Sequence, residues 1–190
     1  MLSRVLLVSG VLVLSSSAFA DARSPYVGQE MRDIKALSAQ DVNGYLEGKG
    51  MGYAKAAELN HYPGPRHVLD LADKLGLSQE QTTRSTALFN DMKAKASALG
   101  KQLVDKEAEL DKRFASGDIN SQRLQALLTE IGELTAKLRY VHLNAHLDQQ
   151  ALLTAQQVKH YDDLRGYGES GSTSAHQHEH GGDHQHLHSH

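Results

Sequence analysis

Residues 78–145 decide the fold of this 190-residue chain. They begin with SQEQTTRSTALFNDMKAKASALGKQLVDKEAELDKRF at 78–114 and resume, after the turn residues Ser116-Gly117-Asp118, with LQALLTEIGELTAKLRYVHLNA at 124–145. Apolar residues recur in helical steps at Leu88, Met92, Ala96, Leu99, Leu103, Leu110, Phe114, Leu124, Leu127, Ile131, Leu134, Leu138, Val141 and Ala145. Such spacing puts the apolar side chains on one helix face. We predict two long antiparallel helices, the first about 37 residues and roughly 55 Å long.

Short helices are expected on both sides of this pair. A hydroxyl residue at the N-cap, followed three positions later by an acid or glutamine, marks helix starts at Ser38, Ser78 and Thr154. A further short helix is expected over residues 53–59, ended by Pro63-Gly64-Pro65. Gly100 lies within the first long helix, where it either bends the helix or is tolerated at a cost of about 1 kcal/mol.

The first 20 residues read as a secretory signal. Arg4 is followed by a short apolar run, and Ala18-Phe19-Ala20 supplies the small residues that precede cleavage. The run is shorter than the roughly 20 residues of a transmembrane helix, so a retained membrane anchor is the weaker alternative. The chain has no cysteine, which excludes disulfides and suits export to a bacterial periplasm. Residues 21–34 are expected to be extended, and 35–167 to form one all-α domain.

Composition excludes several functional classes. The formal net charge is −3, so no basic surface is available for nucleic acid. No second apolar run follows the signal, so the chain is not expected to be embedded in a membrane. No nucleophile with a base, phosphate-binding loop or dinucleotide turn is present. The segment His142-Leu143-Asn144-Ala145-His146 lacks the glutamate of a metalloprotease helix. We therefore do not expect an enzyme.

The two later helix starts share one motif. Leu77-Ser78-Gln79-Glu80-Gln81 and Leu153-Thr154-Ala155-Gln156-Gln157 both read Leu-[Ser/Thr]-x-x-Gln. Together with residues 57–67 and 152–167, this duplication in an exported helical chain resembles the Spy/CpxP family, over roughly residues 35–167. That family contains periplasmic refolding chaperones and periplasmic heavy-metal sensor and resistance proteins. This chain departs from the family pattern at Ser78, where threonine is usual, and at Ala155, where proline is common.

The resemblance implies a curved helical homodimer with two alternative functions. One is a periplasmic metal-binding protein of the heavy-metal resistance or sensor type, which buffers or senses Zn, Cu or Ni and takes its ligands from helices beside the two motifs. A membrane sensor is then a further partner. The other is an ATP-independent chaperone that holds unfolded clients on an apolar concave face. The apolar faces of so elongated a helix pair also favour a second copy as partner.

The C-terminal segment 168–190 is expected to be disordered and to bind metal. It holds seven of the twelve histidines, which are His176, His178, His180, His184, His186, His188 and His190. Neutral imidazole is a ligand for Zn, Cu(II) and Ni. An uninterrupted run would indicate a purification tag, but these histidines alternate with Gln, Glu, Asp and Leu. A transition-metal ion is therefore the expected cofactor, although it is not expected to be needed for folding.

His142 and His146 form a second metal-binding hypothesis. Four residues apart on a helix, they face the same way and can reach one ion. The resemblance places a third ligand at His67, Asp70 or Asp91. The alternative, in which both histidines are ordinary half-buried residues beside the apolar stripe, remains equally open. The remaining two histidines, His61 and His160, are interpreted as structural or exposed.

Overall fold

The computed structural model describes residues 23–168. The predicted signal segment and residues 169–190, which include every tail histidine, lie outside the described residues. The described part divides at Arg32 into two compact units. The first, residues 23–31, contains turns and a short 3-10 helix, η1 (Gln29–Met31), in a segment predicted to be extended. The second contains seven α-helices, and the described residues form no strand.

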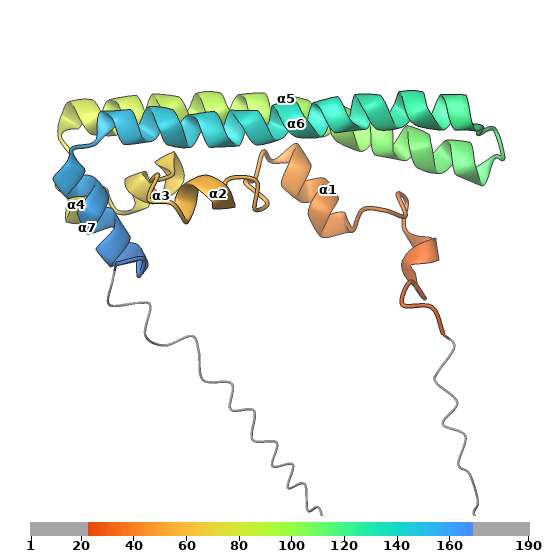
Figure 1. Cartoon of the computed structure of the whole chain (residues 1–190), viewed down its shortest axis with the longest axis horizontal. Helices are drawn as coiled ribbons and strands as arrows, with labels where there is room; N and C mark the ends of the chain where they lie inside the picture. The colour runs from red at the N-terminus through yellow and green to blue at the C-terminus, as the bar shows by residue number, and fades with distance from the viewer. Residues whose placement is uncertain (1–22, 169–190) are drawn as a thin grey trace, which may run out of the picture. The chain divides into compact units, whose positions relative to one another are not determined.

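Two long helices dominate the second unit and confirm the predicted all-α hairpin. Helix α5 (Gln79–Ala115) has 37 residues and α6 (Ser121–Leu152) has 32; they lie antiparallel along their length (Figure 1). The turn between them contains Gly117, with φ of 70°. Asn120, which was not predicted as a cap, accepts the Arg123 backbone N–H at 3.0 Å and starts α6.

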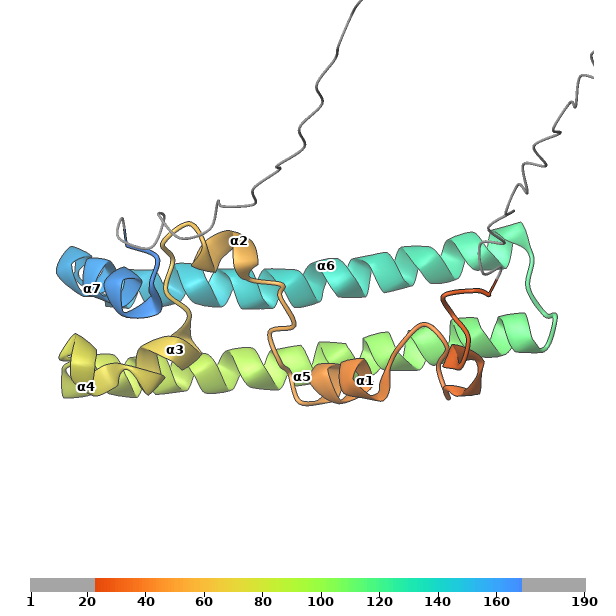
Figure 2. The same cartoon turned by 90° about the horizontal axis from the view of Figure 1, so that it is seen from below.

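Five short helices complete this unit. They are α1 (Ala39–Leu46), α2 (Lys55–Glu58), α3 (Pro65–Asp70), α4 (Ala72–Leu75) and α7 (Ala155–Arg165). Figure 2 shows α1 and α3 over α5, and α2 over α6, all on one face of the long pair. Helices α4 and α7 contact each other at one end. The sequence pattern did not predict α3 and α4 as separate helices, although Pro65 at the first turn of α3 is a usual start signal.

The two Leu-[Ser/Thr]-x-x-Gln motifs are hydrogen-bonded to each other. Ser78 and Thr154 both form the predicted capping boxes, in which Gln81 and Gln157 accept the cap backbone N–H groups. The same two amides also pair across the helix starts: Gln81 Nε2 donates to Gln157 Oε1 at 2.8 Å, and Gln157 Nε2 donates to Gln81 Oε1 at 3.1 Å. The duplicated motif therefore fixes the start of α7 against the start of α5 as well as capping both helices.

The apolar core lies between the long pair and the short helices. Ala96, Leu103, Leu134 and Leu138 form its centre. Gly100 is required for close approach, because a Cβ there would lie 2.2 Å from the carbonyl oxygen of Tyr45 at the end of α1. A second cluster of Val68, Leu75 and Tyr161 holds α3, α4 and α7 together.

The end of the predicted apolar stripe is not part of this core. Phe114 is 56% exposed. The end of α1 packs against Lys93, Ser97 and Gly100 of α5, so it does not cover the last turn of that helix. The sequence period alone therefore overestimates how far the core extends along α5.

Candidate functional site

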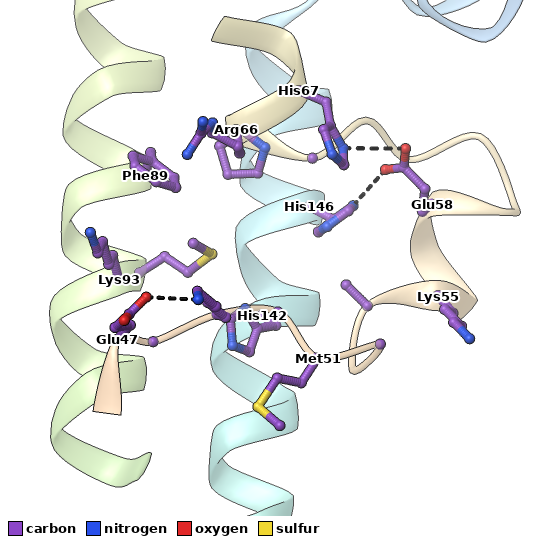
Figure 3. A pocket seen from close by; sticks show the side chains of 18 residues that line it. Glu47, Met51, Lys55, Glu58, Arg66, His67, Phe89, Lys93, His142 and His146 are labelled. Carbon is purple, nitrogen blue, oxygen red and sulfur yellow. Dashed lines mark ion pairs between the residues drawn. The ribbon is translucent and has the colours of Figure 1, made fainter. Parts of the chain in front are cut away.

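A pocket of about 490 Å³ opens on the face covered by the short helices. Its wall includes residues from α2, α3, α5 and α6 and from the loop between α1 and α2 (Figure 3). Its lining includes His67, His142 and His146, the three folded-domain histidines singled out from the sequence, together with two carboxylates that were not, Glu47 and Glu58. The pocket therefore collects side chains from segments far apart in the chain.

His146 is buried, and one of its ring nitrogens is hydrogen-bonded to the backbone. Its side chain lies on the inner face of α6, and Nδ1 is 2.7 Å from the backbone carbonyl oxygen of Tyr62. A carbonyl can only accept, so Nδ1 is the donor, and in the neutral ring the lone pair is on Nε2. Gly64 packs against the ring, because a Cβ there would lie 2.7 Å from Cε1 of His146. The backbone of residues 62–64 thus sets both the tautomer and the position of this imidazole.

Glu58, at the end of α2, is the centre of a hydrogen-bond network. Its Oε1 accepts from the Tyr161 hydroxyl at 2.6 Å, from Arg165 Nε at 3.2 Å and from the Tyr167 hydroxyl at 3.3 Å. Burial alone would raise the pKa of this carboxyl, but the hydrogen bonds from His67 and Tyr161 and the charges of His67 and Arg165 lower it to about 2. Glu58 is therefore ionised throughout the physiological range.

Two of the predicted histidines approach this carboxylate from different helices. His67 Nδ1, from α3, lies 3.5 Å from Glu58 Oε1. His146 Nδ1, from α6, lies 3.8 Å from Glu58 Oε2. Among the described residues, Oε2 has no hydrogen-bond partner. A buried carboxylate oxygen without a donor is uncommon and marks a position where a cation or donor would be stabilised.

His142 lies one turn before His146 and is only 3% exposed. Its ring stacks on Tyr53, with centroids 6.1 Å apart and planes 9° from parallel. Its Nε2 has no hydrogen-bond partner among the described residues. Burial, and to a lesser degree the neighbouring charge of His146, lowers the pKa of His142, so this ring stays neutral more readily than a free imidazole.

The other residues predicted as ligands do not join the pocket. Asp70 pairs with Arg66 at 3.0 Å and Asp91 pairs with Lys95 at 2.7 Å, both on exposed helix surfaces. Neither carboxylate lines the pocket. Each of these acids thus forms an ion pair with a lysine or arginine four residues away on the same helix.

The two histidines interpreted as structural or exposed lie at the surface of the domain. His61 is exposed and pairs with Asp162 at 2.9 Å. His160 is exposed on α7.

The pocket donors have the chemistry of a metal site but are not assembled as one. Within residues 23–168 no three His, Asp or Glu side chains are placed so that they could hold one ion. The rim also carries Lys49, Lys55, Arg66 and Lys93. These positive charges oppose a cation, but salt screens exposed charges. The buried Glu58 carboxylate is the group that would stabilise it.

No local pattern in the sequence indicates that Glu58 belongs to a site. It ends a four-residue helix of sequence KAAE, a composition typical of any solvated helix. Only the packing of α2 against α6 brings it to the histidines.

No family model, curated protein or solved structure matches the chain. The resemblance to the Spy/CpxP family therefore stays a prediction. In the part of the chain that the structure describes, no helix combines the length and apolar character needed to cross a membrane.

Proposed function

We propose that this protein binds transition-metal ions such as Zn(II), Cu(II) or Ni(II), as a periplasmic resistance or sensor protein of the kind the sequence suggests. The observation that carries the proposal is the convergence of His67 and His146 on the Glu58 carboxylate from three separate helices, with their Nδ1 atoms 3.5 and 3.8 Å from its two oxygens. Imidazole nitrogens and a carboxylate oxygen are the donors that structural and catalytic Zn sites use. The tail histidines would bind further metal ions more weakly.

The state of each donor supports this proposal. Metal-bound histidines usually donate their other ring N–H to a carbonyl, as His146 does to Tyr62. His67 is 43% exposed and lies on a six-residue helix, so its ring can reorient at little cost. Glu58 is already ionised, so a cation need not displace a proton from it. Because Nδ1 of His146, the atom 3.8 Å from Glu58 Oε2, already donates to Tyr62, the ion would be bound by Nε2 of this ring. The three side chains would therefore have to move to surround one point.

Calorimetric titration with Zn(II), Cu(II) and Ni(II) tests the proposal. The protein used is a full-length variant whose seven tail histidines are replaced by asparagine, referred to as the tail variant. We expect one ion per chain, with binding lost or weakened at least tenfold in His67→Asn and His146→Asn, since a lost ligand costs more than the roughly 10–100-fold of a lost outer contact. His160→Asn is the matched control and should bind normally. A tail variant that binds no ion, or binding unaffected by both pocket substitutions, would refute the proposal.

A second candidate function, an ATP-independent chaperone, is favoured by the opposite face of the long pair. A groove there is lined by Ala98, Leu99, Ala136, Tyr140 and Val141 with flanking Lys and Gln side chains. Tyr140 is 66% exposed. Exposed apolar surface of this kind fits an unfolded client or the second copy of a homodimer.

Aggregation of a denatured client, followed by light scattering without metal, tests the chaperone function. Tyr140→Ser should weaken suppression of aggregation, whereas Leu59→Ser should not, because Leu59 is comparably exposed at 60% but follows α2 on the other face. Equal activity of the two variants would count against a client site in this groove.

A further inference from the structure

The metal site proposed above does not use His142. It lines the pocket and is only 3% exposed. Its Nε2 has no partner among the described residues. Leaving a buried imidazole nitrogen unpaired is unfavourable, because the nitrogen loses its hydrogen bonds to water. This cost is offset if the nitrogen binds something that the pocket admits.

Two thioethers lie at the same pocket. Met51, from the loop between α1 and α2, and Met92, from α5, both line it together with His142. The chain has only four methionines, of which the other two are Met1 and Met31. Since cysteine is absent, these thioethers are the only soft ligands that the described domain can offer at this pocket.

Met51 occupies a position that favours glycine. Its φ is 43°, in the left-handed region, which is strained for a residue with a Cβ atom. Glycine flanks it on both sides, at Gly50 and Gly52. Its side chain is 39% exposed, so burial in the core does not explain its presence. The sulfur packs over Gly44, where a Cβ would lie 2.7 Å from Sδ. Backbone strain kept for an exposed side chain points to a function of that side chain.

We propose that His142 Nε2 and the sulfurs of Met51 and Met92 form a second site in this pocket, selective for Cu(I). Thioethers are soft ligands that select Cu(I), whereas Zn(II) and Ni(II) prefer nitrogen, oxygen or thiolate donors. The ion binds as Cu(I), and no electron transfer is involved. The inference shares the pocket with the proposed function but uses none of its ligands, so the two can fail separately.

Methionine and leucine are close in volume, which makes Met→Leu the variant least disturbing to folding. Cu(I) affinity of the tail variant is measured without oxygen, in competition with a chromophoric Cu(I) chelator. We expect Met51→Leu plus Met92→Leu to weaken binding by about 100-fold, the upper end of what even outer-shell losses cause. Met31→Leu is the matched control and should bind as the parent does. X-ray absorption of the parent complex should show sulfur neighbours to copper that the double variant lacks. Unchanged affinity in the double variant, or nitrogen and oxygen neighbours alone, would overturn the proposal.

Met51→Gly separates binding from folding. A purely structural Met51 predicts a less stable protein after this substitution. Our proposal predicts unchanged or higher stability, because the strain is relieved, together with weaker Cu(I) binding. Retained Cu(I) affinity would contradict it. Zn(II) titration of the double methionine variant distinguishes the two sites, since Zn(II) binding should be unaffected there even where Cu(I) binding is lost.

Discussion

Replacing Glu58 by glutamine should reduce the acid sensitivity of this fold. In the native protein one carboxylate oxygen accepts hydrogen bonds from Tyr161, Arg165 and Tyr167, and so ties the end of α7 to α2. Glutamine keeps the size and one acceptor oxygen but loses the charge. Arg165 then keeps a partly buried charge without its carboxylate, which is the costly way to break an ion pair.

The size of the effect follows from the pKa of Glu58. That pKa falls from 4.5 to about 2 on folding, which corresponds to about 3 kcal/mol of stability. Because the folded-state value lies below the unfolded one, this contribution is complete above pH 4.5 and disappears as the pH falls toward 2. We expect Glu58→Gln to lower the free energy of unfolding by about 2–3 kcal/mol at pH 7, and by much less near pH 2.

Urea unfolding followed by circular dichroism, with EDTA present and at several pH values between 7 and 2, measures this directly. The native protein should lose stability steeply below pH 4.5, and the variant should lose less. Parallel curves, in which the difference between the two proteins is the same at every pH, would show that the Glu58 charge does not stabilise the fold.

Three further predictions concern folding and use the same denaturation assay. Gly100→Ala should destabilise by more than about 1 kcal/mol, because its Cβ would lie 2.2 Å from the Tyr45 carbonyl oxygen; an unchanged or higher free energy of unfolding would contradict the close approach of α1. Gly132→Ala, a helix position with nothing within 4 Å of the new Cβ, should instead stabilise by about 1 kcal/mol, and a loss of stability would show that this position is crowded. Gln81→Ala and Gln157→Ala should be non-additive, with a coupling energy of about 1 kcal/mol from their paired amides; strict additivity would contradict the pairing.

Local signals in the sequence were sufficient for the long pair and for the starts of α1 and α7, although not for α3 and α4. The capping residues Ser38, Ser78 and Thr154 start helices as predicted, because a cap and its partner lie within four residues. The length of α5 followed from one uninterrupted apolar period. Gly100 was interpreted only as a bend or a tolerated defect, since the approach of Tyr45 depends on a contact between residues 55 positions apart.

The candidate site was predictable only in part, for the same reason. The helical spacing of His142 and His146 placed both on one face, and the structure has both at the pocket. The third ligand was sought at His67, Asp70 or Asp91; His67 lines the pocket, whereas the two acids pair with neighbours on their own helices. Glu58 could not be found, because its partners come from α3, α6 and α7 and not from any pattern near it in the chain.

The state of the five histidines that remain in the tail variant tests the central proposal most directly. Long-range proton–nitrogen NMR reports which imidazole nitrogen carries a proton and which binds a metal. Before metal is added, His146 should show a protonated Nδ1, as its bond to Tyr62 requires. One equivalent of Zn(II) should then shift Nε2 of His146 and the ring of His67, and leave His61 and His160 unchanged. Shifts confined to His61 or His160, or none at all, would contradict metal binding at the Glu58 carboxylate.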